Sequence, residues 1–135
     1  MSDDRLEAAA SLASLGTISA FLSSVMARSG VPSNIAHDIL LAVEEVCVNI
    51  VQHGYRGEEG GIELRVRGRE RALTVEVRDH APAFDPLAVP PPDLSEGWEG
   101  REVGGLGVHF VRNLAEEVSY RREQGQNILL LSFGW

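Results

Sequence analysis

The chain has 135 residues, of which 44% are hydrophobic, and a formal net charge of −8. This length suits one domain, here residues 1–135, and this share of apolar residues is enough for one buried core. The negative charge argues against nucleic-acid binding, because phosphate contacts need clustered basic residues. No run of about eighteen apolar residues occurs, so no membrane contact through a spanning segment is expected. Cys47 is the single cysteine, which excludes an internal disulfide and favours a cytoplasmic protein.

The N-terminal part of the chain reads as a helix from about Leu6 to Arg28, with Leu, Phe and Val at helical spacing. The preceding letters, MSDDRLEAAA, are poor strand material, so no strand is expected before this helix. Gly30 and Pro32 predict a stop and a restart, with Ser33 as the N-cap of a second helix.

The second helix is expected to end near Gly54, and it contains the most informative stretch of the chain. It places apolar side chains on one stripe, namely Ile35, Ile39, Val43, Val46 and Ile50. Glu45 and Asn49 fall one turn apart beside that stripe, and His53 follows one turn later. Polar residues in this position either lie at the solvent-exposed edge of the apolar stripe or are buried and need protein groups or a ligand as hydrogen-bond partners. Cys47, inside the apolar helix, is interpreted as a packing residue.

Two pairs of strands are expected after this helix. Residues 62–68 and 73–77 alternate apolar and polar side chains around a short turn, which predicts a β-hairpin with Asp79 at the end of its second strand. Residues 118–122 and 127–133 form a second hairpin, whose last strand is apolar on both faces and therefore lies inside the sheet. Three helices and about four strands, mostly antiparallel, predict an α+β two-layer sandwich with the helices on one face of the sheet.

Between the hairpins, residues 81–105 are rich in Pro and Gly and show no periodic pattern. We interpret this loop as a lid. Residues 105–115 read as a short helix, entered through the glycine-rich sequence GGLG. Backbone N–H groups at such an entrance can bind an anion such as phosphate, although a hinge or tight turn explains the glycines equally well. The GxxxxGK[ST] motif is absent, and a dinucleotide-binding βαβ unit does not fit.

Three of these side chains suggest phosphate chemistry. Asn49 can offer an oxygen to Mg²⁺, and Glu45 can accept a proton from an attacking water or hydroxyl group. Asp79 can accept a hydrogen bond from an exocyclic amine such as that of adenine, or it can cap a turn. Taken together, they predict a nucleotide site under a lid.

The spacing Glu45-x-x-x-Asn49-x-x-x-His53-x-Tyr55 resembles the N-box of the Bergerat-type (GHKL) ATP-binding superfamily. The spelling is that of bacterial anti-sigma factor serine kinases of the RsbW and SpoIIAB type. The resemblance extends over about residues 30–135, because further motifs follow in the same order and spacing.

One of these motifs is Asp79 with Phe84, Asp85 and Pro86, which resembles the adenine box D-x-G-x-P-F-D-P. Residues 104–107 resemble the second glycine box. The terminal hairpin, with Gly125 and Asn127 before an apolar strand, resembles the last hairpin of the family.

The resemblance implies that ATP and Mg²⁺ are bound. Asn49 would ligate the Mg²⁺ ion, Glu45 would be the catalytic base, and Asp79 would bind the adenine amino group. Further cofactor contacts are expected from the neighbours of these residues and from the glycine box, namely His53, Ala81, Ala83, Phe84, Gly104, Gly105, Leu106, Gly107 and Val108. Ala81 and Ala83 stand where the family has glycine and proline, and the methyl group of Ala81 is expected to weaken binding by crowding the base or restricting the backbone.

Members of this family bind a sigma factor and phosphorylate a serine of an anti-anti-sigma (STAS) antagonist, and they often form homodimers. The leading hypothesis is therefore a protein serine kinase in a partner-switching pathway. An alternative is a regulatory module that holds nucleotide, or only retains the pocket, and sequesters a partner without catalysis. A detached histidine-kinase ATP-binding domain fits less well, because the N-box spelling matches the serine-kinase branch better.

Overall fold

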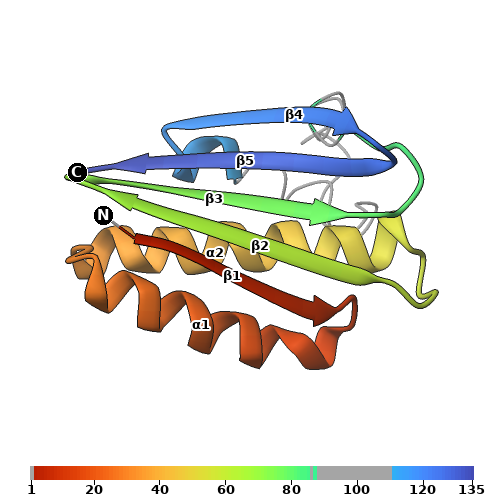
Figure 1. The fold of residues 1–135 in the computed structure, drawn as a ribbon, viewed down its shortest axis with the longest axis horizontal. Helices are drawn as coiled ribbons and strands as arrows, with labels where there is room; N and C mark the ends of the chain where they lie inside the picture. The colour runs from red at the N-terminus through yellow and green to blue at the C-terminus, as the bar shows by residue number, and fades with distance from the viewer. Residues whose placement is uncertain (1, 86, 88–110) are drawn as a thin grey trace, which may run out of the picture.

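The computed structural model describes residues 2–85, 87 and 111–135. It contains a five-stranded antiparallel sheet in the order β1-β2-β3-β5-β4, and helices α1 and α2 lie on one face of this sheet (Figure 1). In chain order the elements are β1 (Ser2–Ala9), a 3₁₀ turn (Leu12–Ser14), α1 (Leu15–Arg28), α2 (Ser33–Asn49), a π-helical segment (Ile50–Gly54), β2 (Gly61–Arg69), β3 (Ala72–Asp79), β4 (Glu117–Glu123) and β5 (Gln126–Gly134). Residues 111–114 are also helical. The predicted α+β two-layer fold is confirmed.

The two predicted hairpins form the centre and one side of the sheet. In β2 the alternation is visible in the burial, because Ile62, Leu64 and Val66 are buried while the residues between them are more exposed. Val66 lies opposite Val75 across the first hairpin, so both strands turn the same apolar face to the helices. β5 lies between β3 and β4, as its apolar sequence predicted.

The prediction for the N-terminus was wrong, because the chain begins with strand β1. Leu6 of β1 lies opposite Leu64 of β2, and the pairing continues along the whole strand. Leu6 and Ala8 are partly buried against the core, so the alternation was present although the strand propensity of the residues was low. Pairing with a complete neighbouring strand overrides that propensity. Helix α1 consequently starts at Leu15 instead of near Leu6, and the sheet has five strands instead of about four.

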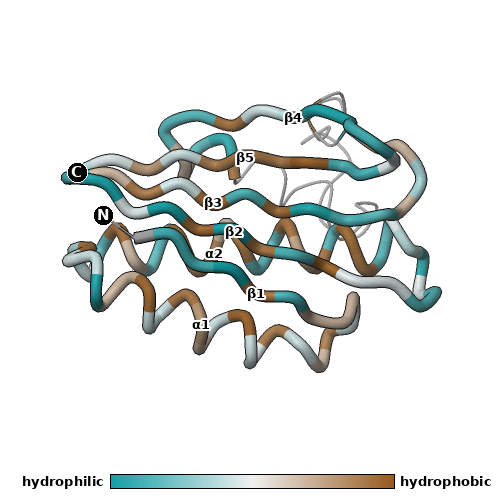
Figure 2. Tube along the Cα trace, in the orientation of Figure 1, coloured by the Kyte–Doolittle hydropathy of each residue, from teal (hydrophilic) through white to brown (hydrophobic). Residues whose placement is uncertain are grey.

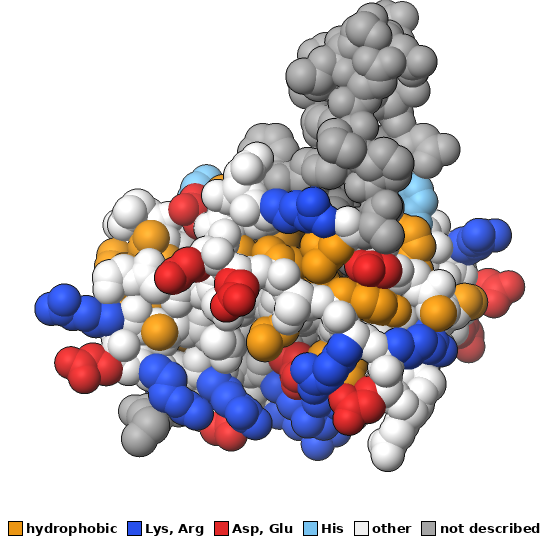
Figure 3. Space-filling view, turned by 90° about the horizontal axis from the view of Figure 1, so that it is seen from above, with side chains coloured by type: hydrophobic (Ala, Val, Ile, Leu, Met, Phe, Trp, Pro, Cys, Tyr) orange, Lys and Arg blue, Asp and Glu red, His pale blue; other side chains and the backbone are white. Residues whose placement is uncertain are grey.

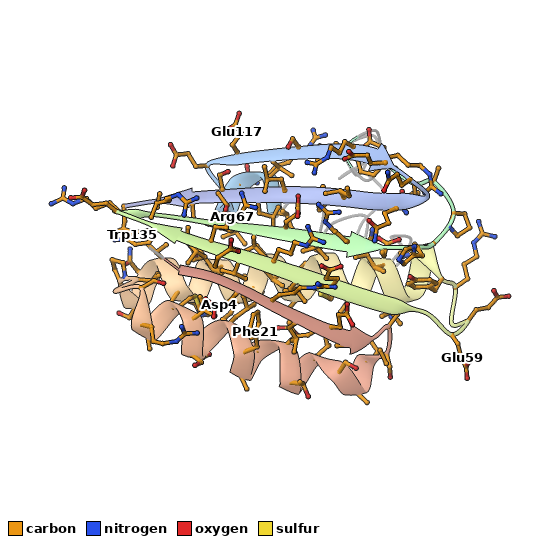
Figure 4. The ribbon with its side chains drawn as sticks, in the orientation of Figure 1. Asp4, Phe21, Glu59, Arg67, Glu117 and Trp135 are labelled. Carbon is orange, nitrogen blue, oxygen red and sulfur yellow. The ribbon has the colours of Figure 1, made fainter. Side chains whose placement is uncertain are left out.

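A charged contact joins the end of α1 to this first strand. Figure 4 shows Asp4 on β1 above α1, and Arg28 in the last turn of α1 donates a hydrogen bond to its Oδ1 at 3.0 Å. The side chain of Arg28 is half exposed, so solvent screens this pair and its contribution to stability is about 1 kcal/mol or less. The contact links the C-terminal end of α1 to β1.

The two long helices bury their apolar faces against the sheet, as the brown segments of the tube in Figure 2 indicate. Along α2 and into the π-helical segment the predicted stripe is confirmed, since Ile39, Val43, Val46 and Ile50 are buried and Ile35 is partly buried. Ser33 is the first residue of α2, not its N-cap; Pro32 occupies the cap position with φ −59° and ψ 148° and makes no side-chain cap. The fixed φ of proline suits this position before a helix. Neither α1 nor α2 is both long and apolar enough to cross a membrane.

Cys47 lies in the middle of this core and is fully buried, as predicted. Burial, together with the charge of Glu44, raises the pKa of its thiol to about 12. The thiol is therefore protonated at neutral pH and behaves as a small apolar side chain.

The face of the sheet away from the helices is covered with ion pairs. Arg5 and Arg65 both contact Glu63, at 2.8 and 2.6 Å, and Arg121 contacts Glu76 at 3.1 Å. Figure 3 shows how closely acidic and basic side chains are intermixed on the surface. In these pairs the glutamate side chains are only 13–15% exposed and the arginines 36–58%, so solvent screens the pairs only in part. An apolar pocket is therefore expected on the other face of the sheet, which the helices cover.

The end of α2 differs from a regular helix. The chain remains helical to Gly54, as predicted, but residues 50–54 form a π-helical turn in which Tyr55 N–H bonds to the carbonyl of Ile50 at 2.8 Å. Tyr55 Oη then donates to the carbonyl of Gly61 and accepts from His80 N–H, each at 2.8 Å. The wide turn thus directs a buried tyrosine between the start of β2 and the end of β3.

We expect Gly60→Ala to destabilise the protein, because a Cβ atom there would lie 2.2 Å from Cε1 of Tyr55, whose ring is held by two hydrogen bonds. The expected loss in the free energy of unfolding is about 1–3 kcal/mol, as for other overpacked sites. Gly61→Ala is the matched control, since its Cβ would be 3.7 Å from the nearest atom. Urea unfolding of both variants measures the difference, and equal stability of the two would contradict the prediction.

Candidate nucleotide-binding site

A pocket lies between the end of α2 and strands β3, β4 and β5. Most of its walls are apolar, and three polar side chains, Asn49, Asp79 and Asn127, are each only 5–6% exposed. The described residues that line it are Val46, Asn49, Ile50, Gly54, Asp79, Phe84, Leu87, Val111, Val118, Tyr120, Asn127 and Leu129. The structure therefore brings together Asn49 of the N-box with Asp79 and Phe84 of the adenine box, two motifs that are separate in the sequence.

Asp79 occupies the end of β3, as predicted, and its carboxylate is buried. Oδ1 accepts hydrogen bonds from Ala81 N–H and from Asn127 Nδ2, both at 2.9 Å. The bond to Ala81 is the turn-capping role that the sequence had left open, so a turn cap and a pocket wall coexist in one side chain. Burial raises the pKa of Asp79, and the hydrogen bonds from Asn127 and Ala81 and the charges of Arg122 and His80 oppose this shift.

Asn127 is the second residue of β5, and the sequence resemblance included it only as part of the last hairpin, without a role in the site. Its Nδ2 donates to Asp79 Oδ1 at 2.9 Å and reaches the carbonyl oxygens of Ala81 and Pro82 at 3.2 and 3.1 Å. One buried amide thus holds the carboxylate and the backbone that follows it. The sequence did contain a sign of this role, because Asn127 is a polar residue at the start of an otherwise apolar strand.

The other side of the same amide is held by β4. Asn127 Oδ1 accepts from Tyr120 Oη at 2.6 Å and from Arg122 Nη1 at 2.9 Å, with Phe84 N–H further away at 3.4 Å. Tyr120 lines the pocket, and Arg122 lies two residues further along β4, so its side chain leaves the strand on the same face although it is exposed. The polar cluster therefore includes two residues that sequence reasoning had treated only as part of a strand.

Ala81 is buried and is not among the residues that line the pocket. Its methyl group faces Gly54, where an added Cβ atom would be 3.3 Å away. Ala81, which replaces the glycine of the family motif, is thus opposite Gly54, the last residue of the π-helical segment. His53, Ala81, Ala83 and Phe84 line a neighbouring, more open groove.

The remaining predicted residues are placed as follows. Glu45 is half-buried on α2, one turn before Asn49, and does not line the pocket. Gly104, Gly105, Leu106, Gly107 and Val108, with most of the predicted lid, lie outside the described residues. Next to that segment, Val111 lines the pocket, and Arg112 donates a hydrogen bond to the carbonyl of Leu87.

The described part of the chain can be tested for its fit to ATP and Mg²⁺. An apolar pocket with one buried carboxylate suits a flat heterocycle that carries an amine. In the described residues no group of three or more His, Cys, Asp or Glu is placed to hold a metal ion. A Mg²⁺ ion would therefore take few ligands from these residues, such as the amide oxygen of Asn49, and complete its shell with phosphate oxygens and water, which is its usual mode with nucleotides.

A buried polar cluster beneath an apolar pocket is the kind of site that suits a small molecule. Comparison with known proteins identifies the family. Residues 8–133 match the histidine kinase-like ATPase domain family. The serine-protein kinase RsbW of Listeria monocytogenes is 30% identical over 125 residues, which are 89% of this chain and 78% of that protein. The serine-protein kinase RsbW of Bacillus thuringiensis is 28% identical over 116 residues, 83% of this chain and 72% of that protein.

A solved structure shows the same fold. It contains the RsbU and RsbW domains of Rv1364c from Mycobacterium tuberculosis, and it superposes with a TM-score of 0.69 at 18% identity over 99% of this chain. The chain spans 32% of the length of that protein. The chain belongs to the histidine kinase-like ATPase domain family, and within it to the group of RsbW-type serine kinases.

Proposed function

We propose that this chain is an ATP- and Mg²⁺-dependent protein serine kinase, with residues 1–135 acting as a single ATP-binding domain. The observation that carries the proposal is the meeting of Asn49 and Asp79, 30 positions apart in sequence, as buried polar residues of one apolar pocket. The names of the relatives, serine-protein kinases, support the same reaction.

In this proposal each residue has a defined task. Asp79 accepts a hydrogen bond from the exocyclic amine of adenine, and the apolar wall around Phe84 contacts the ring. The amide oxygen of Asn49 would hold Mg²⁺, which would supply positive charge to the phosphate groups of ATP. Residues 104–108, at the predicted helix entrance, bind phosphate through backbone N–H groups.

Glu45 is the proposed base. It takes the proton of a serine hydroxyl while the serine Oγ forms a bond to the γ-phosphorus of ATP and the bond from that phosphorus to ADP breaks. Most of the rate enhancement would come from alignment and charge stabilisation, because phosphoryl transfer needs little other chemistry from the protein.

The proposed substrate is a serine of a STAS-domain antagonist, and the second proposed partner is a sigma factor. These partners are those implied by the resemblance of the N-box to the RsbW and SpoIIAB type, and the name of the relatives, serine-protein kinase, supports a serine as the target. The proposed place of action is the cytoplasm, where both partners and ATP occur, and a homodimer is a proposed assembly.

The alternative is a module that binds a partner without catalysis, and Ala81 in the adenine box favours it. In that case a nucleotide-free Asn49→Ala protein would retain its partner. The Ala81 methyl group packs beside Gly54, and Ala81 itself does not line the pocket although Gly54 does, which argues for the kinase.

Calorimetric titration with ATP, with and without Mg²⁺, tests the proposal. We expect Mg²⁺-dependent binding by the native protein and a loss of at least about tenfold in affinity for Asn49→Ala, which removes one metal ligand. Asn34→Ala is the matched control, since Asn34 lies on the same helix but is exposed. If the native protein bound no ATP, the kinase proposal would be wrong and the non-catalytic module would replace it.

A further inference from the structure

The side chain of Asn127 lies where strand β5, strand β4 and the turn after β3 meet. We infer that Asn127 is a positioning residue for base recognition, which fixes the Asp79 carboxylate and the turn behind it without touching the base. This inference rests on the proposed function, because it concerns how the same pocket selects its nucleotide. Its geometry is shown by the hydrogen bonds of a single buried amide.

The orientation of this amide is determined by its partners. Its nitrogen faces three oxygen atoms, those of the Asp79 carboxylate and of the Ala81 and Pro82 carbonyls. Its oxygen faces two donors on β4, the Tyr120 hydroxyl and the Arg122 guanidinium. Exchanging nitrogen and oxygen would place the amide oxygen against three acceptor oxygens and the amide nitrogen against the guanidinium of Arg122, which can only donate. Only one orientation therefore satisfies the cluster.

These contacts use up the hydrogen-bonding capacity of the amide. The two N–H bonds of Nδ2 are shared among three acceptors, and Oδ1 accepts from Tyr120 and Arg122 at 2.6 and 2.9 Å. Asn127 therefore has little capacity left for a ligand although it lines the pocket. Its effect on a bound base must act through Asp79.

Asp79 needs such a support because it is the last residue of β3 and the chain turns immediately after it. Oδ1 is engaged by Ala81 N–H and by Asn127, so the plane of the carboxylate is set by groups behind it. With Oδ1 held in this way, the geometry leaves Oδ2 as the oxygen to accept a hydrogen bond from the base. Recognition of an amine depends on this plane, since hydrogen bonds weaken steeply when misaligned.

Strand β4 completes the support through Arg122. Its Nη1 contacts both Asn127 Oδ1 and the carbonyl of Ala81, at 2.9 and 3.2 Å, and its Nη2 reaches the carbonyl of Gly125 at 3.4 Å. The guanidinium group thus connects the β4–β5 turn to the turn after β3. Tyr120, two residues before Arg122 on β4, donates a shorter hydrogen bond to the same amide oxygen, at 2.6 Å.

The test compares the affinities of ATP and of purine riboside triphosphate, which carries hydrogen in place of the exocyclic amine. We expect the native protein to prefer ATP by about 10- to 100-fold, the range for a hydrogen bond to a charged group. In Asn127→Ala this ratio should fall below about threefold, while the affinity for the analogue changes little. A general loss of protein stability would instead lower the affinities for ATP and for the analogue by the same factor.

Gln126→Ala is the matched control, because Gln126 is the neighbouring residue of β5 and bonds to Arg78 and His80, away from the pocket lining. It should keep the native ratio. Should Asn127→Ala not fold, Tyr120→Phe removes one bond to the amide and leaves the rest, and it should reduce the ratio about two- to fivefold. A native ratio in the folded Asn127→Ala protein, or in Tyr120→Phe when that variant has to be used, would overturn the inference.

A second readout needs no nucleotide and separates this inference from the proposed function. The amides of Ala81 and Phe84 bond to Asp79 Oδ1 and Asn127 Oδ1, so their hydrogen exchange should accelerate at least about tenfold in Asn127→Ala. Amides in the β2–β3 pairing should keep their native protection. Failure of the native protein to bind ATP would refute the proposed function, whereas unchanged exchange at both amides would refute the role of Asn127.

Discussion

Replacing Asp79 by asparagine is expected to abolish nucleotide binding and to leave the protein at least as stable at neutral pH. The amide oxygen of the variant can still accept from Ala81 N–H and Asn127 Nδ2, so the turn after β3 is retained. Its nitrogen would then face the pocket, as a donor opposite the donor amine of adenine. The affinity for ATP should fall at least about 100-fold, since a charged hydrogen bond is replaced by a donor-to-donor contact.

The stability of Asp79→Asn should exceed that of the native protein by an amount that grows with pH. Burial raises the pKa of Asp79 in the folded state, so between the ordinary carboxyl pKa of about 4 and the raised value the folded protein binds more protons than the unfolded chain. The free energy of unfolding of the native protein therefore decreases as pH rises through this interval. The asparagine variant cannot ionise at this position and escapes that decrease.

Urea unfolding from about pH 3 to about pH 8 covers the interval above the ordinary carboxyl pKa of about 4 and measures the effect on stability. Calorimetric titration with ATP at about pH 7 measures the effect on affinity. Asp85→Asn is the matched control, because Asp85 is exposed and its Oδ1 accepts a local hydrogen bond, from Leu87 N–H at 2.8 Å. A native affinity for ATP in Asp79→Asn would exclude adenine recognition by this residue. A stability difference that shrinks as pH rises would contradict the direction of the pKa shift.

The sequence was sufficient for the features that depend on local periodicity. The alternation in β2 and β3 determined which side chains face the helices, and the stripe on α2 determined which face is buried. Asp79 could be located because a polar residue ended an apolar strand, and the structure places it beside Asn49 in one pocket. Patterns of this kind survive folding because they are imposed by the burial of one face.

Other features depend on contacts between distant residues, which no local pattern reports. β1 exists because β2 offers it a complete ladder of partners, although its own residues are weak strand formers. The role of Asn127 required knowledge of three segments at once, since its partners come from β3, from β4 and from the turn after β3. The π-helical turn before Tyr55 likewise follows from its contacts with Gly61 and His80.

The division between these two groups has a functional meaning. The residues whose role could be predicted from the sequence are those proposed to touch the ligand. The residues whose role became visible only in the structure hold them in place. Ala81 illustrates the difference. Its departure from the family motif suggested a crowded base, but the structure buries its methyl group opposite Gly54, so the two positions must be considered together.

Glu45→Gln is expected to reduce phosphoryl transfer about 10²- to 10⁴-fold while ATP binding stays within about twofold of the native value, because glutamine keeps the shape of the side chain but cannot take a proton. Glu45 is half-buried on α2, one turn before Asn49, and does not line the base pocket, so binding of adenine should not depend on it. Glu44→Gln is the matched control, since Glu44 is the exposed neighbour, about 100° around the helix.

The measurement is transfer of the γ-phosphoryl group to STAS-domain proteins of the same organism, with calorimetric titration of ATP in parallel. A loss confined to Glu45→Gln at unchanged ATP affinity would place the effect in the chemical step, because an interaction needed only in the transition state lowers the rate without altering ground-state binding. Equal losses in the Glu44 and Glu45 variants would point to the charge of this helix face instead of a base. Transfer at the native rate in Glu45→Gln would mean that the serine proton leaves by another route, and alignment with charge stabilisation would then account for the reaction without a side-chain base at this position.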